Sequence, residues 1–236
     1  MLKKSKQISL SDLFFCYTIG MNKEELMEAI GRFCDQKSSV TIRICGHGAS
    51  GKSTLAADLA QYLGKEEVNV LAGDLYVIPG QISDQAFLRY EMEGQAVEAS
   101  ITACHPARHE LISLKRDISA LSRGMDLLTP DMPWQKEEIL KGQKPITIVE
   151  GMSPTFLEKD LFDLSIYIYT DAETELARRL VRDVAERGRI PDFVQKNADR
   201  RRRQYQLYME PYKNEFDILI NDSQGQFLIE ANSFRN

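Results

Sequence analysis

The sequence lacks the features that identify metal-stabilised, redox-active and membrane-bound proteins. Its 236 residues include four cysteines at wide spacings and no C-x-x-C pair, which supports neither a zinc site nor a redox motif. No apolar run approaches the roughly 18 residues of a membrane span, and the apolar run 13–17 is shorter than the core of a signal peptide. We therefore expect a cytoplasmic protein with free thiols and no membrane partner.

An excess of basic residues is also missing. Lys and Arg number 30 against 35 Asp and Glu, which gives a net charge of -5 and argues against a general nucleic-acid coat. Four arginines at 200–203, followed by Tyr205 and Tyr208, would suit an RNA-associated ATPase. The acidic balance instead favours a solvated helix face or a cationic rim that attracts ATP, and we expect no nucleic-acid partner.

Hydrophobic runs and helical patterns alternate along most of the chain. Strands are expected at 40–45, 68–72, 145–149, 164–169 and 216–220, and helices at 52–63, 106–122 and about 172–187. Such alternation predicts an α/β domain, here residues 39–236, with a mostly parallel sheet. Residues 1–38 are expected to be an N-terminal helical extension. In it, Asn22 would cap an amphipathic helix that packs on the main body or contacts a second copy in a homo-oligomer.

A phosphate-loop motif follows the first expected strand. The segment fits G-x-x-x-x-G-K-[ST], and with the next residue it comprises Gly46, His47, Gly48, Ala49, Ser50, Gly51, Lys52, Ser53 and Thr54. In such loops glycines let the backbone wrap around phosphates, the lysine reaches the β- and γ-phosphates, and the following hydroxyl holds Mg²⁺. A ligand-free turn would leave Lys52 and Ser53 unexplained, so the segment predicts a nucleotide site. His47 is given no role apart from its place in the loop.

Two further absences narrow the class of nucleotide-binding protein. The sole Asn-Lys pair, Asn22-Lys23, precedes the loop and continues into Glu24, so the guanine-reading N-K-x-D of GTPases is missing. The third expected strand ends in Glu150-Gly151 and lacks the Asp-Glu pair that is usual in motor ATPases. A small-molecule kinase remains, and it needs a base for the attacking hydroxyl and cations around the migrating phosphoryl group.

Two carboxylates at strand ends are candidates for this chemistry. Asp74 follows the second expected strand, at the edge where open α/β sheets bind ligands. It would accept the hydroxyl proton as a general base or orient Mg²⁺ through water. Glu150 ends the third expected strand and would hold the water shell of the metal or a substrate hydroxyl. The structural alternatives, an Asp that caps a turn and a Glu on a solvated turn, stay open at this point.

Five arginines gather within twelve residues after the fourth expected strand. They are Arg178, Arg179, Arg182, Arg187 and Arg189. The planar guanidinium fork suits phosphate oxygens. In an acidic protein with a phosphate loop, this density predicts an arginine-rich helical lid over about 174–205 that clamps phosphate. Ion pairs on a solvated helix face would explain part of the pattern.

The order of these motifs resembles that of the uridine kinase/phosphoribulokinase family of P-loop kinases. The shared features are the phosphate loop, a strand followed by Asp-x-Tyr, a strand followed by Glu-Gly, the segment R-R-x-x-R-D-x-x-E-R-G-R, and a later Pro-x-Lys, over about residues 39–222. The resemblance implies a P-loop NTPase three-layer sandwich. It also implies transfer of the γ-phosphate of ATP, with Mg²⁺, to a sugar or sugar-like hydroxyl.

The resemblance also implies roles for individual residues. Asp74 would be the base, Lys52 and Ser53 would bind phosphate and metal, and Glu150 would support the metal site. Phosphate would be clamped by Arg179, Arg182 and Arg187. Contacts to the acceptor would come from Asp74, Tyr76, Glu150 and Arg189.

The acceptor region departs from the uridine kinase pattern. Those enzymes carry an acidic residue before a His-Pro pair, but here Cys104 precedes His105-Pro106. The His and Arg of a pyrimidine pocket are also missing after the segment 130–135. Uridine is therefore not the expected substrate, and a choice between ATP and GTP has no sequence signal. His105 stays a candidate acceptor contact. The alternative function is a non-catalytic or regulatory nucleotide-binding protein with a degenerate acceptor site.

Overall fold

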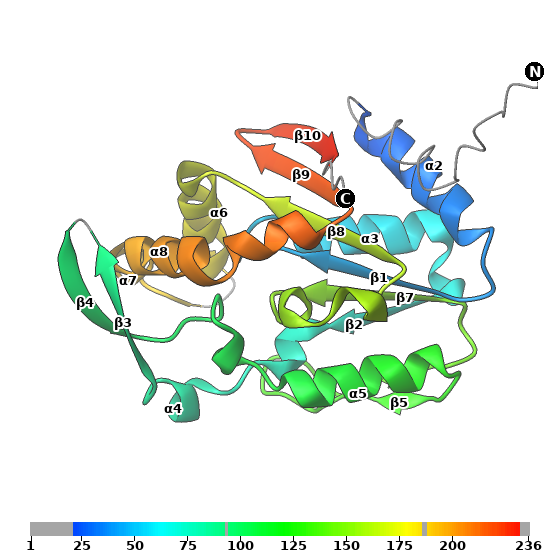
Figure 1. The fold of residues 1–236 in the computed structure, drawn as a ribbon, viewed down its shortest axis with the longest axis horizontal. Coiled ribbons are helices and arrows are strands. Elements are labelled where there is room, and N and C mark those ends of the chain that lie inside the picture. The colour runs from blue at the N-terminus through cyan, green and yellow to red at the C-terminus, as the bar shows by residue number, and fades with distance from the viewer. Residues whose placement is uncertain (1–20, 93, 186–187, 232–236) are drawn as a thin grey trace, which may run out of the picture.

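A six-stranded sheet forms the centre of the computed structural model, which describes residues 21–92, 94–185 and 188–231 (Figure 1). Its strands are β1 (Val40–Cys45), β2 (Val68–Ala72), β7 (Ile146–Gly151), β8 (Leu164–Tyr169), β9 (Ile218–Ser223) and β10 (Gln226–Ala231). They lie in the order β10-β9-β8-β1-β7-β2. All neighbours are parallel except β9 and β10, which confirms the expected α/β fold with a mostly parallel sheet.

Helices lie on both sides of this sheet (Figure 1). The helices of the described residues are α2 (Lys23–Cys34), α3 (Lys52–Leu63), α4 (Gly80–Ser83), α5 (Leu111–Ser122), α6 (Ala172–Ala185), α7 (Pro191–Lys196) and α8 (Ala198–Tyr208). The short helix α4 stands apart from the main sheet, beside the strands 87–92 and 95–100 (Figure 1). Two short antiparallel pairs, β3 (Phe87–Met92) with β4 (Gln95–Ser100) and β5 (Leu127–Leu128) with β6 (Ile139–Leu140), stand outside the main sheet.

The alternation of buried side chains along β7 and β8 explains the two layers of helices. Ile148 packs in one core cluster with α2 and α3, while its neighbour Val149 packs in another with α5. Along β8, Ile166 joins the first cluster, and Tyr167 joins a third one with Tyr205 of α8. Successive strand residues face opposite sides of a sheet, so both faces of these central strands are covered.

Helix α2 is part of the core. Asn22 caps it, because its side chain accepts from Glu25 N–H at 2.9 Å while the Glu25 carboxylate accepts from Asn22 N–H at 2.9 Å. Leu26 and Ile30, both fully buried, then pack with α3 and the sheet. The part of the expected extension before residue 21 lies outside the described residues.

Several expected boundaries were wrong. The helix expected over 106–122 begins at Leu111, because Pro106 opens a short 3-10 turn, η3 (Pro106–Arg108), and His109 is extended in a bridge to Val77. The last parallel strand covers Ile218–Ser223 in place of 216–220. Helix α6 matches the described part of the helix expected over 172–187, and residues 186 and 187 lie outside the described residues. The lid segment expected over about 174–205 also contains α7 and most of α8. Within the described ranges no helix is long and apolar enough to cross a membrane.

Candidate active site

The phosphate loop joins the end of β1 to the start of α3. Ala49 and Gly51 adopt left-handed conformations with φ of 66° and 101°, and Gly46 has φ of 147°. A Cβ atom on Gly46 would lie 1.9 Å from the carbonyl oxygen of Ile168 in β8, so only glycine fits there. Left-handed residues between right-handed ones form the backbone concavity that binds anions, and α3 adds the positive end of its dipole.

Lys52 and Ser53 open α3 from the loop. Lys52 is buried, its Nζ donates to the carbonyl oxygen of His47 at 2.8 Å, and burial lowers its pKa. The Ser53 hydroxyl lies 3.1 and 3.2 Å from the two carboxylate oxygens of Glu150. Burial raises the pKa of Glu150, Lys52 counteracts this, and the charge of Asp74 adds to it.

The two candidate carboxylates are held at neighbouring strand ends. Glu150 in β7 is in register with Ala72, the last residue of β2. The chain then enters the turn η2 (Gly73–Tyr76), which carries Asp74 with its side chain exposed to solvent. The charge of Asp74 acts on the pKa values of both Lys52 and Glu150, which places all three in one electrostatic neighbourhood. The structure therefore brings Lys52, Ser53, Glu150 and Asp74 together.

The donor set at this edge fits Mg²⁺ bound jointly with phosphates. Across the described residues no group of three or more His, Cys, Asp or Glu side chains forms a complete metal cage. A single hydroxyl and a single carboxylate meet instead, at Ser53 and Glu150. Mg²⁺ is usually held by one or two carboxylates together with water and substrate phosphates. The residues present thus suit a metal that arrives with a nucleotide.

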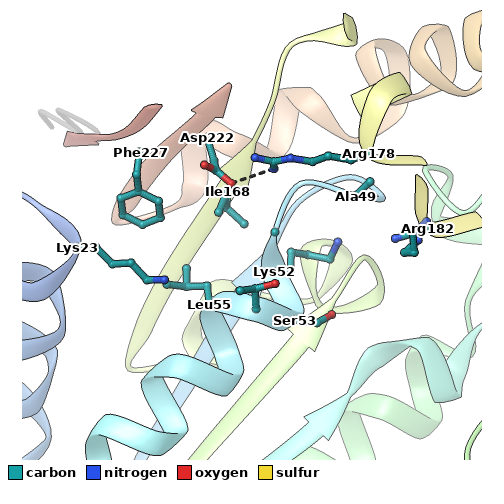
Figure 2. A pocket seen from close by; sticks show the side chains of 12 residues that line it. Lys23, Ala49, Lys52, Ser53, Leu55, Ile168, Arg178, Arg182, Asp222 and Phe227 are labelled. Atoms are coloured by element: carbon teal, nitrogen blue, oxygen red, sulfur yellow. Dashed lines mark hydrogen bonds and ion pairs between the residues drawn. The ribbon is translucent and has the colours of Figure 1, made fainter. Parts of the chain in front are cut away.

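A cavity of about 550 Å³ opens beside the loop (Figure 2). It is lined from the loop and α3 by Ala49, Gly51, Lys52, Ser53, Thr54 and Leu55, and from other elements by Lys23, Ile168, Arg178, Arg182, Asp222 and Phe227. Arg178 donates to the Asp222 carboxylate at 2.9 Å across this cavity. The space continues from the phosphate loop towards β9 and β10, so it is large enough for more of a nucleotide than its phosphates.

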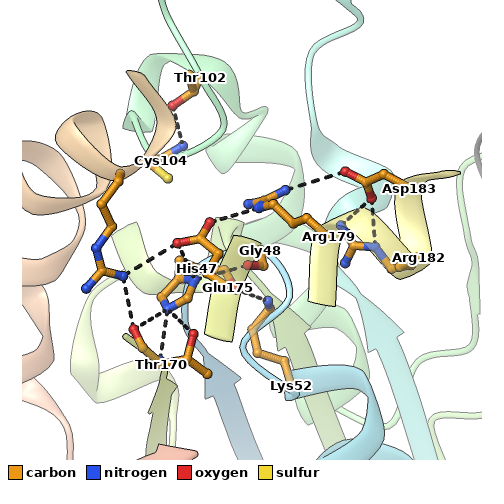
Figure 3. Close-up of polar contacts among 11 residues, drawn as sticks. His47, Gly48, Lys52, Thr102, Cys104, Thr170, Glu175, Arg179, Arg182 and Asp183 are labelled. Carbon is orange, nitrogen blue, oxygen red and sulfur yellow. Dashed lines mark hydrogen bonds and ion pairs between the residues drawn. The ribbon is translucent and has the colours of Figure 1, made fainter. Parts of the chain in front are cut away.

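The arginines of α6 lie over the phosphate loop. Arg179 is buried, and its Nε donates to Glu175 at 2.8 Å. Its guanidinium lies so close to the loop that a Cβ on Gly48 would be 2.3 Å from Nη2. Arg182 donates to Asp183 at 2.7 and 2.9 Å and lines the cavity (Figure 3). Ion pairs on α6 therefore hold two of the predicted phosphate-binding arginines beside the loop.

Of the other two arginines predicted to bind ligands, Arg189 is the one within the described residues. Arg187 lies outside the described residues. Arg189 follows α6, and its guanidinium packs over the ring of Phe193 at 5.4 Å from the ring centroid. Its N–H donates to the carbonyl oxygen of Asp183 at 2.9 Å. Arg189 does not line the cavity beside the phosphate loop.

His47 has a structural role that the sequence did not indicate. Its ring is fully buried beneath the loop, and burial lowers its pKa to about 4, so it is neutral. Nε2 accepts a hydrogen bond from the Thr170 N–H at 3.0 Å, so the ring proton of the neutral histidine is on Nδ1. Nδ1 lies 3.0 Å from the Gly48 carbonyl oxygen and 3.4 Å from the Glu175 carboxylate (Figure 3). The histidine thus connects the loop to α6 and to Thr170, the residue that follows β8. Thr170 and Glu175 lie more than 120 residues from His47 in the sequence, and no local motif indicates these contacts.

Tyr76 is not brought into the site. Its side chain is buried in the cluster around α5, and its hydroxyl donates to Asp117 at 2.7 Å. Burial and this hydrogen bond raise its pKa. The turn that exposes Asp74 directs Tyr76 inward to the α5 layer, and the role of Tyr76 as an acceptor contact stays a prediction.

His105 caps the η3 turn and is partly exposed. Its Nδ1 accepts from the Ala107 N–H at 3.1 Å, and its ring packs edge-on against Tyr208 at 4.8 Å. It does not line the cavity beside the phosphate loop. Its role as an acceptor contact stays a prediction.

A second histidine, His109, connects the acceptor segment to the Asp74 turn. It is 6% exposed, with Nε2 2.8 Å from the carbonyl oxygen of Ala103 and Nδ1 2.7 Å from the Ser153 hydroxyl. Ser153 lies three residues after Glu150, and its hydroxyl donates to the carbonyl oxygen of Gly73 at 2.8 Å. The pair therefore joins the segments that carry the two carboxylates. The sequence analysis missed it, because neither residue belongs to a motif.

Known proteins share this architecture. The chain is 28% identical to a uridine kinase of Brevibacillus brevis over 221 residues, which cover 84% of this chain and 97% of that one. It is 31% identical to a uridine kinase of Clostridium tetani over 195 residues, 78% of this chain and 87% of the relative. The solved structure of phosphoribulokinase from Rhodobacter spheroides is similar in fold, with a TM-score of 0.56 at 16% identity over 78% of this chain and 70% of that one.

The extent of a match to a family sequence model identifies the family of this chain. A sequence model of the phosphoribulokinase / uridine kinase family matches residues 41–226, which include the phosphate loop, both carboxylates and the arginines of α6. The same range contains all the parallel strands of the sheet, apart from Val40 at the start of β1. The chain therefore belongs to the phosphoribulokinase / uridine kinase family of P-loop kinases.

Proposed function

We propose that the protein is an ATP-dependent kinase that transfers the γ-phosphoryl group to a hydroxyl of a small metabolite. The observation that carries the proposal is the meeting of Lys52 and Ser53 with Glu150 and Asp74 at one edge of the sheet. Relatives named uridine kinase support a nucleoside or sugar-like acceptor. The acceptor segment here nevertheless has Cys104 before His105-Pro106, where the uridine kinase pattern expects an acidic residue.

Each residue has a definite task in this proposal. The loop and Lys52 bind the phosphate chain, and Ser53 and Glu150 would hold Mg²⁺, which supplies charge neutralisation to the transferring group. Asp74 takes up the proton of the attacking hydroxyl as the oxygen bonds to the γ-phosphorus and the bond to the bridging oxygen of ADP breaks. Asp74 suits this task because it is exposed, whereas Glu150 is partly buried against Ser53.

Arg179 and Arg182 would stabilise the charge on the transferring phosphoryl group. Arg179 already lies against Gly48 of the loop, fixed by Glu175. Glu175 keeps its own negative charge, because Arg179 and Arg202 lower its pKa against the opposing effect of burial. An arginine that is held in place before the reaction loses little entropy when phosphate binds.

The direct test is ADP release from Mg·ATP, measured in a coupled assay against a panel of nucleosides, sugars, sugar phosphates and hydroxy acids. We expect one acceptor class to raise the rate well above background hydrolysis. The variant Lys52→Ala should lose the increase in melting temperature caused by Mg·ATP, whereas the exposed Lys65→Ala should keep it.

Two results would contradict the proposal. If Mg·ATP does not raise the melting temperature of the wild-type protein, the nucleotide site is refuted. If ATP binds but no acceptor in the panel stimulates ADP release, a regulatory nucleotide-binding function takes first place.

A further inference from the structure

Helix α2 contributes a side chain to the cavity beside the phosphate loop. Lys23, the first residue of α2, lines this cavity together with Phe227 of β10. Figure 2 shows both side chains on the side of the cavity opposite to Arg182. The phosphates of a nucleotide would lie at Lys52 and Ser53, so the rest of the molecule would extend towards this far side.

Neither Lys23 nor Phe227 belongs to the segment that the family model matches. That segment covers residues 41–226, so it begins after α2 and ends one residue before Phe227. The cavity is therefore closed on this side by parts of the chain for which the family match does not account. What these two side chains recognise is set by this chain and not by the matched segment.

Phe227 presents an aromatic ring to the cavity. It is in register with Asp222 on the neighbouring strand β9, so the two side chains share one face of the sheet. The ring is partly buried against the core cluster of α2, α3 and the sheet, and it also lines the cavity beside Asp222. A rigid apolar ring in this position can stack on a flat heterocyclic base.

Lys23 is held in place from two sides. The capping box of Asn22 and Glu25 fixes the start of α2, and the Asp58 carboxylate of α3 accepts from the Lys23 Nζ at 2.5 Å. This Nζ also lies 5.8 Å from the centroid of the Phe227 ring. The side chain is still 35% exposed, and of the three donors of its ammonium Asp58 uses one within the described residues. Lys23 can therefore donate to an acceptor atom of a ligand in the cavity.

The stability of α2 does not explain this lysine. A cation at the first position of a helix faces the positive end of the helix dipole, which is unfavourable. An ion pair as exposed as that of Lys23 with Asp58 contributes little to stability. Local preferences of this kind are commonly overridden at functional sites, so the position of Lys23 at the cavity is better explained by a ligand than by the fold.

A second lysine–phenylalanine pair, at the other end of α2, provides an internal comparison. The Lys37 Nζ lies 4.8 Å from the centroid of the Phe33 ring and forms an ion pair with Asp163 at 2.5 Å. Phe33 packs against the same core cluster as Phe227. Neither Lys37 nor Phe33 lines the cavity beside the phosphate loop. The two pairs thus have similar contacts, and access to the cavity distinguishes them.

We propose that Phe227 and Lys23 bind the base of the nucleotide, which makes α2 a part of the nucleotide site. The inference rests on the proposed kinase function and assigns the base end of the same site. Phe227 would stack on the base, and Lys23 would donate to an acceptor atom at the edge of the base. Stacking of a base on an aromatic side chain strengthens binding by about 5- to 150-fold.

The test separates the base from the phosphates by comparing two ligands. A non-hydrolysable ATP analogue and inorganic tripolyphosphate, each with Mg²⁺, are titrated into the protein by calorimetry. We expect Phe227→Leu to bind the analogue at least fivefold more weakly than the wild type, and Lys23→Gln to bind it at least threefold more weakly. Both variants should bind tripolyphosphate as the wild type does, because this ligand carries no base.

Phe33→Leu and Lys37→Gln are the matched controls, since they make the same changes in the pair that lies away from the cavity. Both should bind the analogue as the wild type does. The melting temperature shows whether each variant is folded. If Phe227→Leu does not fold, because its ring also packs on the core, the comparison of Lys23→Gln with Lys37→Gln decides.

The ADP-release assay gives a second readout. Phe227→Leu and Lys23→Gln should raise the KM for ATP by the same factors and leave the acceptor KM unchanged. Analogue binding within twofold of the wild type for both variants would overturn the inference and leave the kinase function intact. Equal weakening of analogue and tripolyphosphate would overturn it as well, because the phosphate site would then be the part affected. A wild-type protein that binds neither ligand refutes the nucleotide site itself.

Discussion

At the scale of single residues, Asp74 is the group on which phosphoryl transfer should depend most. Asp74→Asn keeps the size of the side chain but removes its ability to take up the hydroxyl proton. Because the side chain is exposed and forms none of the core, the variant should fold and bind ATP normally. We expect the acceptor-dependent rate to fall by about 10²–10⁴-fold, the usual contribution of a general base.

Asp160→Asn provides the matched control, since Asp160 is an exposed aspartate in the turn η5 (Lys159–Leu161). It should leave the rate unchanged. Both variants are compared by ADP release at saturating Mg·ATP. A rate for Asp74→Asn within threefold of the wild type would remove Asp74 from the mechanism.

Tyr76 offers the opposite case, a residue two positions from Asp74 that should affect stability alone. Tyr76→Phe removes the hydrogen bond to Asp117, whose carboxylate is buried and would keep only its contact with Arg116. Leaving a buried acceptor short of a donor costs about 1–3 kcal/mol. The free energy of unfolding in urea should fall by this amount, while the acceptor KM stays the same.

Tyr62→Phe is the control, because Tyr62 is 52% exposed and should tolerate the loss of its hydroxyl. An increase in the acceptor KM for Tyr76→Phe, without loss of stability, would restore Tyr76 to the substrate site. The two readouts therefore separate a core residue from a binding residue.

At the scale of elements, the phosphate loop depends on the strand beside it. Gly46→Ala would place a Cβ atom 1.9 Å from the Ile168 carbonyl oxygen, at a residue with φ of 147°. Backbone overlap and left-handed strain together should cost about 3 kcal/mol or more. For a chain of this length, that lowers the melting temperature by roughly 6–12 °C.

Gly64, at the other end of α3, is the control for this prediction. It also has a positive φ, 91°, but a Cβ atom there would meet nothing within 4 Å. Gly64→Ala should therefore cost about 1 kcal/mol from conformational strain alone. Equal melting temperatures for the two variants would show that β8 does not constrain the loop.

The elements that the sequence predicted well are those with local signals. The phosphate loop is a continuous motif, and the strands before and after it are short segments rich in Val, Ile and Leu, so neither needed knowledge of distant contacts. The hairpin of β3 and β4 was missed because its alternating exposed residues carry no apolar run. The start of α5 was placed five residues early, because the bridge of His109 to Val77 overrides the helical pattern there.

The residues of the candidate site were likewise predictable only where they carry a local sequence signal. Glu150 could be found because it ends a buried strand. The contacts that fix the loop and the carboxylates, from His47 to Glu175 and from His109 to Ser153, join residues 44 or more positions apart. A histidine in isolation gives no periodicity and no spacing rule. Only the fold shows that these two rings are buried between functional segments.

At the scale of the whole molecule, the candidate site is assembled by the parallel sheet. Neighbouring parallel strands β1, β7 and β2 end at the same edge, which brings the loop, Glu150 and the Asp74 turn together. Helices α6 and α8 then cover the loop through Arg179 and the ring of Tyr205, which packs on His47 at 4.7 Å. The geometry of the site and the stability of the fold therefore depend on some of the same buried groups.

The two buried histidines make this dependence measurable as an effect of pH on unfolding. Burial lowers the pKa values of His47 and His109 to about 4, whereas an unfolded histidine titrates near 6.5. Between these values the unfolded chain binds protons that the folded chain does not, so stability rises with pH across this window. It is fully present above about pH 6.5 and is lost as the pH falls towards 4.

Between pH 7 and pH 5 each histidine should account for about 2 kcal/mol of this loss, by linkage from the two pKa values. Most carboxylates of the unfolded chain are still ionised there, so the histidines dominate the change. Urea unfolding at both pH values and constant ionic strength measures it. His109→Gln should be less stable than the wild type at pH 7, because it loses the bond to Ser153, yet it should lose less stability on going to pH 5. An equal loss in the two proteins would mean that His109 is protonated in the folded state, where Nδ1–H would donate to Ser153 and Nε2–H to the carbonyl oxygen of Ala103.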